Sequence, residues 1–505
     1  MNTTHVTTGL APRATARDWA GLAVLALALL LLAVDATVLD LAVPAISADL
    51  APSTPQLLWI IDVYSFVLAG LLVVMGNLGD RIGRRRLLLI GAVGFGLASA
   101  LAAWSMSAEM LIAARVLQGV AGATLMPATL GLIRSMFQDA RQRTLAIGVW
   151  SAMAGGGAAA GPLVGGWLLE HFWWGSVFLV NLPVMLVLVL LAPVLIPESR
   201  DPNPGRFDLV SALLSMLALV PAVYAVKEIA AHGPTAGVLL VGVLGVVSGV
   251  LFVRRQRSLD DPMLDLRLFA LPRFRVAVFT NLLAVFALAG VLFFGSQYLQ
   301  LVLGRSPLEA GVVMLPGLVA SVLGSLAAAW LVRVMRPGAV LAGALLVTAV
   351  GAAAFLALGA TSGVEAFVLG FVGIGAGAGV AMTVSADLVV GSAPQERAGA
   401  AAAISETAYE TGLALGVALL GSTVMAVFRR GLDLSLLPDD LAASASGSLS
   451  GAVAAAADLP ATVADEFLTS VYEAFVSGIH LTVLGIVAVL LAAAFAALRT
   501  KSTAS

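Results

Sequence analysis

Carboxylates recur in stretches of this sequence that are otherwise apolar. Asp35 and Asp40 lie in the run AVDATVLDLAVP, and Glu406 and Glu410 lie in SETAYETG. A carboxylate in apolar surroundings is costly unless it meets a cation or takes up a proton. These residues therefore have the chemistry for cation binding and for proton transfer.

Glu406 and Glu410 are four residues apart, so on a helix they lie one turn apart on the same face. Like charges at that spacing repel each other, and burial further disfavours ionisation. We expect at least one of the two to carry a proton. The alternative is a neutral carboxylic acid that only hydrogen-bonds to a neighbouring helix.

The other charges differ in depth. Counting about 1.5 Å per helical residue places Asp35 near the middle of a membrane. Asp40, Asp62 and Arg115 fall nearer the outer ends of their apolar runs, at a shared depth where they can pair. For Asp40 and Arg115, a structural ion pair is as consistent with the pattern as a role in transport.

Aromatic residues accompany one of these acids. Asp62 lies in WIIDVYSF, with Trp59 and Tyr64 close by. Aromatic faces attract organic cations, although an aromatic belt at the membrane surface would give the same pattern. We expect two sets of residues: a proton-coupling set, Asp35, Glu406, Glu410 and Arg115, and a substrate-binding set, Asp62, Trp59, Tyr64 and Glu410.

The elements that must position these residues are long apolar helices. The chain has 505 residues, of which 60% are hydrophobic and only 11% charged, whereas a soluble domain carries about 25% charged residues. The pattern predicts an all-α polytopic membrane protein. The expected fourteen spans are 19–46, 55–78, 87–106, 108–135, 143–169, 173–196, 208–229, 234–254, 274–302, 307–332, 338–360, 364–391, 397–428 and 471–498.

The distribution of basic residues agrees with this count. If both termini are cytoplasmic, the inner segments hold 22 Lys and Arg residues and the outer segments hold 4. This asymmetry is the one expected of a membrane protein. The segment 429–470 then lies outside, and its small and acidic residues predict a mobile or weakly helical spacer.

Several kinds of site are excluded. There is no cysteine, and the four histidines show no metal-ligand spacing, so we predict no metal site. Neither Lys227 nor Lys501 follows a glycine, which excludes a phosphate-binding loop for ATP. No nucleophile–base constellation points to an enzyme, and a net charge of −2 does not point to nucleic acid. We therefore expect no cofactor, and the energy for any pumping would come from an ion gradient or from a separate subunit.

Two motifs suggest moving parts. The segment GNLGDRIGRRRLLLIGA at 76–92 contains Gly79, Asp80, Arg81, Gly83 and Arg84, and a degenerate copy at 327–344 suggests two related halves. An ordinary positively charged inner loop is the alternative.

The segment GGGAAAGPLVGG at 155–166 predicts a bend and close helix packing, which would form a hinge or a purely structural kink. Its residues of interest are Gly157, Gly161, Pro162, Gly165 and Gly166.

These motifs, with RVLQGVAGA at 115–123 and the two acidic segments, resemble those of the fourteen-helix drug:proton antiporters of the major facilitator superfamily. The resemblance covers the whole chain. It implies the major facilitator fold, with two six-helix bundles at 19–196 and 274–498 and two inserted helices at 208–254. The tails at 1–18 and 499–505 would be cytoplasmic.

The resemblance also implies a function. It predicts a proton-coupled antiporter that exports lipophilic, mostly cationic drugs, dyes and quaternary ammonium compounds across the plasma (inner) membrane of a bacterium. Its partners would be small hydrophobic cations, protons and the lipid bilayer, with no nucleic acid, and it would work as a monomer. Two alternatives remain: a proton symporter importing a nutrient or siderophore, and a receptor or channel-like protein without coupled transport.

Overall fold

The computed structural model describes residues 13–499 apart from 53, 203–207, 261, 435–436, 438–441, 443–444, 447 and 458. All regular structure in this described part is helical. Thirteen segments of it are long and apolar enough to cross a membrane, and α5, a helix of 32 residues between the fourth and fifth of them, is a fourteenth long helix. The predicted all-α polytopic membrane fold is confirmed.

The chain forms two halves and an inserted hairpin. The helices of the N-terminal half are α1 (Ala16–Leu50), α2 (Thr54–Ile82), α3 (Arg84–Ala103), α4 (Ala108–Met136), α5 (Ala140–His171), α6 (Ser176–Leu179) and α7 (Asn181–Leu195). The inserted hairpin consists of α8 (Leu209–His232) and α9 (Ala236–Ser258). The C-terminal half contains α10 (Pro272–Gln297), α11 (Pro307–Val334), α12 (Pro337–Ala354), α13 (Glu365–Ser392), α14 (Ala398–Leu415), α15 (Gly421–Gly431), α17 (Leu449–Ala456) and α18 (Ala461–Arg499).

Five short elements complete the description. They are the 3-10 helices η1 (Leu266–Ala270), η3 (Phe355–Ala357) and η4 (Gln395–Arg397), and the π-helical turns η2 (Tyr298–Val302) and η5 (Gly416–Leu420). The turn η5 joins α14 to α15, so the two form one membrane crossing. Helices dominate because a bilayer offers no water to backbone groups, which must bond within their own segment.

Polar residues mark where the helices start. Thr15 and Asp18 form a reciprocal capping box on α1, and Ser306 and Glu309 form one on α11. The side chain of Asp139 accepts a hydrogen bond from the backbone of α5 in the same way. Such caps satisfy first-turn N–H groups that have no partner within the helix.

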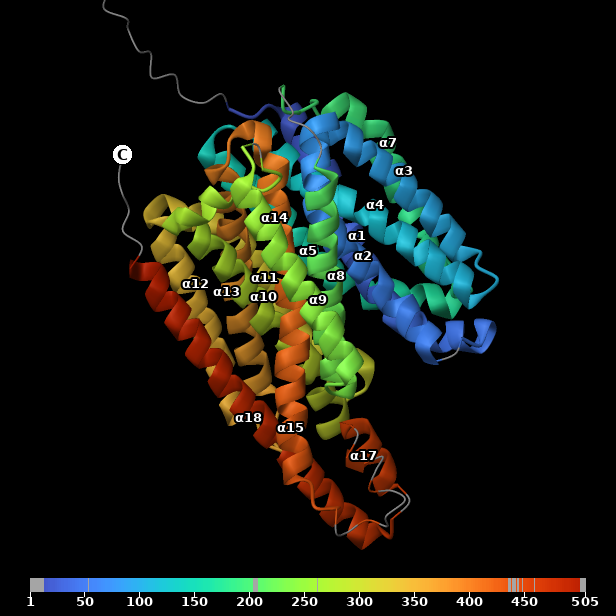
Figure 1. Cartoon of the computed structure of the whole chain (residues 1–505). Helices are drawn as coiled ribbons and strands as arrows, with labels where there is room; N and C mark the ends of the chain where they lie inside the picture. The colour runs from blue at the N-terminus through green and yellow to red at the C-terminus, as the bar shows by residue number, and fades with distance from the viewer. Residues whose placement is uncertain are drawn as a thin grey trace, which may run out of the picture.

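The two halves lie side by side and meet along α2 and α4, which pack against α14, and along α5, which packs against α11. Figure 1 shows that the start of α1 and the end of α18 point to the same end of the bundle. We call this the basic end, because the arginine clusters at 84–86 and 254–257 lie there. The two halves therefore share a long central seam.

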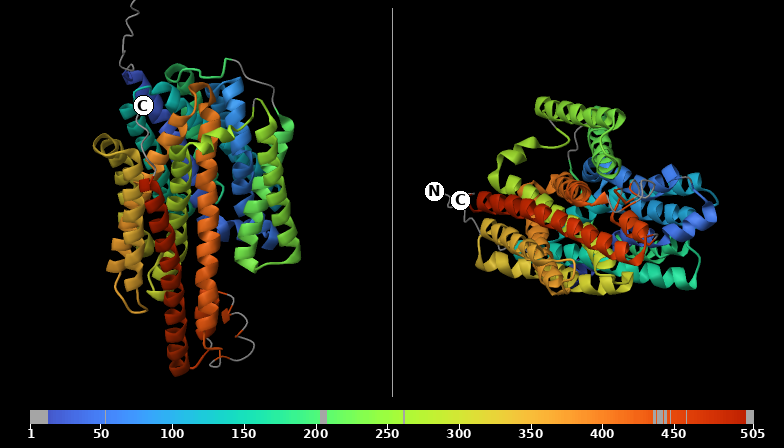
Figure 2. Two further views of the ribbon diagram at one scale, coloured as in Figure 1. Left: turned by 60° about the vertical axis from the view of Figure 1, so that its left-hand side comes forward. Right: turned by 90° about the horizontal axis from the view of Figure 1, so that it is seen from below.

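The hairpin of α8 and α9 stands on one flank of the bundle (Figure 2). It packs on the N-terminal half through α2, where Val220 lies over Gly70 and the ring of Tyr224 meets that of Phe66 edge-on at 6.0 Å. Its base is closed by Arg255, which donates two hydrogen bonds of 2.9 Å to Asp208.

The segment predicted as a spacer at 429–470 contains ordered helix in its described residues. α18 begins at Ala461, and α17 lies at the end of the molecule opposite the basic end (Figure 1). Leu449 of α17 and Phe467 of α18 are both buried. Both belong to the apolar core of the C-terminal half, which therefore extends into this region.

Candidate functional site

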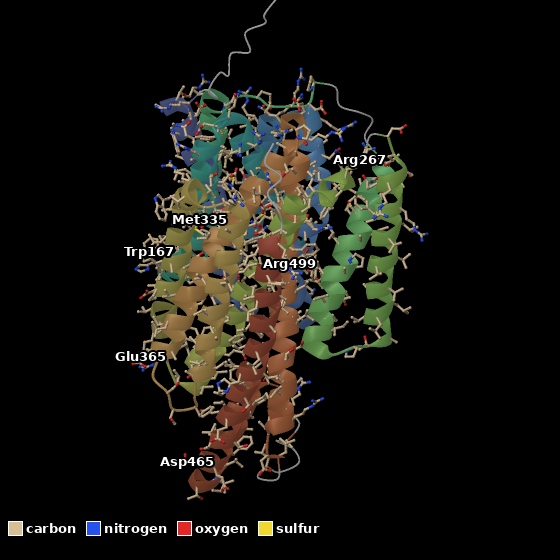
Figure 3. The ribbon with its side chains drawn as sticks, turned by 90° about the vertical axis from the view of Figure 1, so that its left-hand side faces the viewer. Trp167, Arg267, Met335, Glu365, Asp465 and Arg499 are labelled. Atoms are coloured by element: carbon tan, nitrogen blue, oxygen red, sulfur yellow. The ribbon has the colours of Figure 1, made fainter. Side chains whose placement is uncertain are left out.

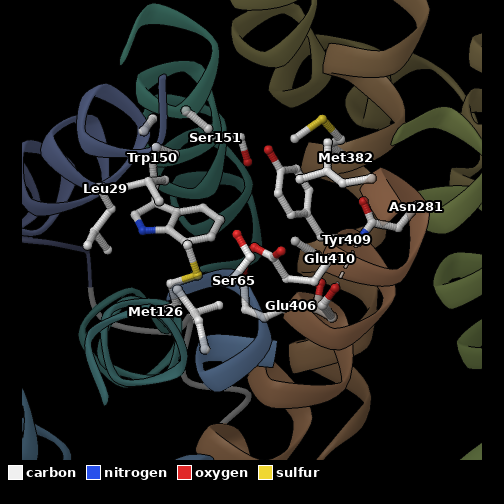
Figure 4. A pocket seen from close by; sticks show the side chains of 18 of the residues that line it. Leu29, Ser65, Met126, Trp150, Ser151, Asn281, Met382, Glu406, Tyr409 and Glu410 are labelled. Carbon is white, nitrogen blue, oxygen red and sulfur yellow. Dashed lines mark hydrogen bonds between the residues drawn. The ribbon is translucent and has the colours of Figure 1, made fainter. Parts of the chain in front are cut away.

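A cavity lies between the two halves. It encloses about 140 Å³ open to water-sized molecules. Its walls come from α1, α2, α4 and α5 on one side and from α10, α13 and α14 on the other (Figure 4). Both halves therefore contribute to one site.

The two walls differ in chemistry. The N-terminal half presents a mainly apolar surface that includes Leu29, Met126 and Trp150. On the opposite wall, α14 presents Glu406 and Glu410, with Tyr409 between them in sequence. An acidic wall thus faces an aromatic and aliphatic one.

The prediction that Glu406 and Glu410 share one face is confirmed, because both line the cavity. Glu406 is only 5% exposed. Within the described part of the chain, no hydrogen bond or salt bridge reaches its carboxylate. The neighbouring amide of Asn281 donates instead to the backbone oxygen of Ser405, at 3.0 Å. A buried carboxylate in this setting is stable without its charge or beside a cation.

A second buried acid is fully partnered. Asp35 is 1% exposed and forms a salt bridge of 3.1 Å with Arg115, which is 2% exposed. Arg115 also donates to Gln118 at 3.1 Å, and the amide of Asn181 donates to Asp35 at 2.7 Å and to Ser99 at 3.0 Å. We call these five residues the Asp35 network. It draws on α1, α3, α4 and α7.

The sequence placed Arg115 at the depth of Asp40 and Asp62, whereas the structure pairs it with Asp35. Asp35 and Asp40 are five residues apart, which is about 140° around a helix, so both cannot face the same partner. The side chain of Asp40 lies outside the described residues.

Tyr64 connects the two regions. Its ring lines the cavity, and the guanidinium of Arg115 lies 4.5 Å from the ring centroid. A cation over an aromatic face is attracted to it, and the attraction strengthens when water is excluded. The Asp35 network therefore contacts an aromatic ring that lines the cavity.

Two of the predicted substrate-binding residues lie elsewhere. Neither Asp62 nor Trp59 is among the described residues that line the cavity. Trp59 is 45% exposed, and its ring meets Phe66 edge-on at 6.2 Å. The structure brings Tyr64 and Glu410 into the site but leaves this pair outside it.

The inner-loop motif ties the halves together at the basic end. Asp80 accepts hydrogen bonds of 2.9 Å from the backbone N–H groups of Gly399 and Ala400, at the start of α14. Arg84 forms a salt bridge of 2.7 Å with Asp80 and donates to the backbone oxygen of Glu396 at 2.8 Å. A carboxylate at a helix N-terminus satisfies free N–H groups and complements the helix dipole.

The remaining residues of that motif shape the turn. Gly83 has φ +108, and a Cβ there would meet the carboxylate of Glu198. That backbone conformation favours glycine. A Cβ at Gly79 would touch Leu87 at 3.2 Å, and Arg81 closes the last turn of α2. These positions hold the α2–α3 connection in a tight form.

The glycine motif of α5 lets two helices approach closely. A Cβ at Gly161 would clash with Thr37, and one at Gly157 would clash with Leu30, both on α1. α5 continues as one helix from Ala140 to His171, so Gly161 and Pro162 do not divide it. The side chain of Pro162 lies outside the described residues. Further along α5, Gly165 is buried and Gly166 is exposed.

A second tie between the halves had no counterpart in the sequence analysis. Arg143 and Thr144, at the start of α5, both bond to the carboxylate of Asp387 on α13. Arg134 on α4 adds a hydrogen bond of 3.3 Å to the backbone oxygen of Val390. The sequence did offer a signal for this contact, because Asp387 is an acidic residue in the apolar run VSADLVVG. Asn181 and Asn281 were missed as single polar residues in apolar runs, and Tyr409 was missed although it lies in the quoted segment SETAYETG.

No group of three or more potential metal ligands occurs among the described residues. The site is a cavity at the seam of two helical bundles, with buried charges at its walls, in a chain that crosses a membrane many times. That arrangement is the one found in membrane transporters.

The comparison with known proteins identifies the family. The sequence pattern of the Major Facilitator Superfamily matches residues 25–417. The chain belongs to this family, as the motifs predicted, and it is a transporter and not an enzyme.

Three curated relatives are similar over nearly their whole lengths. The multidrug efflux pump LfrA of Mycolicibacterium smegmatis is 50% identical, over 95% of this chain and 96% of the relative. The methyl viologen resistance protein SmvA of Salmonella typhimurium is 39% identical, over 91% and 93%. The tetracenomycin C resistance and export protein of Streptomyces glaucescens is 34% identical, over 94% and 91%.

Solved structures agree on the fold. The human organic anion transporter MFSD10 aligns with a TM-score of 0.61 at 16% identity, over 94% of this chain and 99% of that protein. A bacterial homologue of the human lysosomal transporter Spinster, in an inward-facing conformation, aligns with a TM-score of 0.57 at 18% identity, over 97% and 100%.

Proposed function

We propose that this protein exports drugs from a bacterial cell, that its substrates are lipophilic and mostly cationic, and that protons flowing inward drive the export. The observation that carries the proposal is the cavity between the halves, where the acidic wall of Glu406 and Glu410 faces Trp150 and other apolar residues. Such a site suits a molecule with a positive charge and a large apolar body.

The binding step follows from electrostatics. Opposite charges attract far more strongly in a site from which water is largely excluded than in bulk water. The aromatic rings of Trp150, Tyr64 and Tyr409 add faces that attract a cation. The aliphatic wall buries the rest of the molecule, which explains how one cavity accepts many shapes.

The exchange step uses the same carboxylates. In the empty cavity a proton on Glu406 removes the cost of an isolated buried charge. An incoming organic cation replaces that proton, and a proton from outside later replaces the cation. A one-for-one exchange of a proton for a monocation moves no net charge, so the proton concentration gradient drives it. Each additional proton carried inward down the membrane potential supplies about 2.3 kcal/mol per 100 mV. No cofactor takes part in this cycle.

The Asp35 network is the second component. Asp35 pairs with Arg115, whose guanidinium also lies over the ring of Tyr64, and a proton delivered to Asp35 would weaken the pair and strengthen the pull of Arg115 on this ring of the cavity wall. We propose that protonation of Asp35 and release of substrate are coupled by this route. Both walls of the cavity come from one chain, and we propose that the monomer is the functional unit.

The names of the relatives support export over import. LfrA is named a multidrug efflux pump, and the Streptomyces relative is named a resistance and export protein. SmvA is named for resistance to methyl viologen, which is an organic dication. A nutrient symporter would be expected among relatives named for uptake.

The decisive test is transport in reconstituted vesicles. With an imposed proton gradient and no ATP, a cationic dye should be pumped uphill, and a proton ionophore should stop it. Substrate added to the detergent-solubilised protein should release protons into unbuffered solution. Transport that needs ATP and ignores the ionophore would overturn the proposal.

The orientation is testable separately. We propose that the basic end faces the cytoplasm, because most Lys and Arg residues gather there. The chain has no cysteine, so Ser446→Cys gives a single labelling site near the opposite end. An impermeant thiol reagent should label it in intact cells. Labelling only after lysis would invert the topology.

A further inference from the structure

A cleft separate from the central cavity lies at the basic end of the C-terminal half. It has a volume of about 470 Å³ and is formed by α10, α12, α13 and α18. Arg273 at the start of α10 and Arg336 at the start of α12 line it, together with apolar residues such as Leu341 and Leu498. Figure 3 shows Met335 and Arg499 at this end of the C-terminal half.

The cleft is positively charged. None of its described lining residues is acidic. α12 begins at Pro337 with Arg336 as its N-cap, and no side chain caps that helix, so the positive end of its dipole is open to the cleft. A third arginine, Arg499, ends α18 just after the lining residue Leu498, but its guanidinium lies 4.2 Å from the ring centroid of Phe495 and it is not among the lining residues.

An apolar groove adjoins this cleft. The groove has a volume of about 500 Å³ and runs between α11 and α12 over α13. It is lined largely by small and aliphatic residues, among them Gly324, Gly343 and Gly377. Ala339, in the first turn of α12, lines both the groove and the cleft. The charged cleft and the apolar groove therefore meet at one helix start.

We propose that this composite site binds one anionic phospholipid from the leaflet at the basic end. The phosphate group would lie between Arg273 and Arg336 at the start of α12, and an acyl chain would lie in the groove past Ala339 and Gly343. The proposal concerns a site outside the central cavity and does not depend on which substrate is exported.

Two features favour a lipid over a soluble anion. Basic pockets between membrane helices at the cytoplasmic side bind anionic headgroups, and each nearby arginine contributes about 1 kcal/mol of attraction. A free phosphate would use the arginines but would leave the groove empty. Only a molecule with an anionic head and a long apolar tail matches both parts.

The experiment measures lipids retained by the purified full-length protein in neutral detergent, by native mass spectrometry with phosphatidylglycerol or phosphatidylcholine added. The wild type should retain one phosphatidylglycerol in clear preference to phosphatidylcholine. Arg336→Gln should weaken that preference about fivefold, and the double variant with Arg273→Gln should weaken it further. Arg254→Gln, an exposed arginine of α9 at the same end, is the matched control and should change nothing.

Gly343→Leu tests the groove. A Cβ at Gly343 meets nothing within 4 Å, so the backbone there accepts a side chain, and Gly343 lines the groove that this side chain would occupy. It should weaken retention of phosphatidylglycerol while both arginines remain. If Arg254→Gln weakens the preference for phosphatidylglycerol as much as Arg336→Gln does, retention reflects general surface charge and the proposed site is wrong. Displacement of the lipid by millimolar inorganic phosphate, or no effect of Gly343→Leu, would overturn the assignment of a lipid.

Discussion

The two buried acidic regions of this protein differ in how their charge is compensated. Asp35 has an arginine at 3.1 Å and an amide donor at 2.7 Å, all within the N-terminal half. Glu406 is buried almost as deeply, yet among the described residues it has no such partner and faces an open cavity. A compensated charge holds helices in place, whereas an uncompensated one is free to exchange a proton for a ligand. The variants below test that contrast.

The largest effect is expected for Asp35→Asn. The amide keeps the shape but leaves Arg115 buried without a counter-charge, which costs about 3–5 kcal/mol. We expect a much lower Tm and no uphill export of any substrate. Thermal unfolding and dye efflux in vesicles measure the two effects at matched expression.

The double variant Asp35→Asn/Arg115→Gln separates stability from coupling. It should recover most of the Tm, because no unpaired charge remains, but export should stay absent. If Asp35→Asn still pumps and still releases protons on substrate binding, the role given to the Asp35 network is wrong.

Glu406→Gln should behave in the opposite way. No buried partner loses its charge, so the Tm should change little, while proton release on substrate binding and uphill export should fall by about tenfold or more, equivalent to about 1.4 kcal/mol. Glu466→Gln makes the same chemical change on an exposed residue of α18 and serves as the control. A large drop in Tm for Glu406→Gln would remove the distinction between the two regions.

Glu410→Gln should cause a smaller and selective loss. With Glu406 still present, one carboxylate remains to meet a single positive charge. Export of a dication such as methyl viologen should fall about tenfold, and export of a monocation only about threefold. Equal losses for both classes would show that the two glutamates do not divide the charge between them.

Asp208→Asn should have the smallest effect of these variants on Tm and on export. It breaks a carboxylate–arginine pair that is partly exposed and lies just outside α8. Exposed pairs contribute little, so Tm should fall by less than about 2 °C with export unchanged. The hydrogen bond from Arg255 holds the pKa of Asp208 at about 2. A depressed pKa stabilises the folded state above the ordinary value near 3.9, so this contribution should persist at neutral pH and disappear between about pH 4 and pH 2.

The sequence predicted the features that depend on one helix at a time. The apolar runs located the long helices, and a spacing of four residues placed Glu406 and Glu410 on one face, where the structure has them. Helical periodicity fixes both results without knowledge of the neighbours.

Features that depend on the relative rotation of two helices could not be predicted. Depth along each helix suggested Asp40 or Asp62 as the partner of Arg115, but rotation and packing select Asp35. The same limit applies to Asp80, whose hydrogen-bond partners lie 319 and 320 residues away in sequence at the start of α14. No local pattern specifies such a contact.

The polar ties at the basic end have a thermodynamic consequence. Asp80 and Arg84 hold the start of α14, and Arg143 holds Asp387, so these bonds join the halves and must break before the halves can separate at that end. Their combined free energy therefore sets the ratio of two populations, one closed and one open at the basic end. Each 1.4 kcal/mol removed by substitution shifts that ratio about tenfold, so a substrate bound with moderate affinity can be exported or retained according to bonds it never touches.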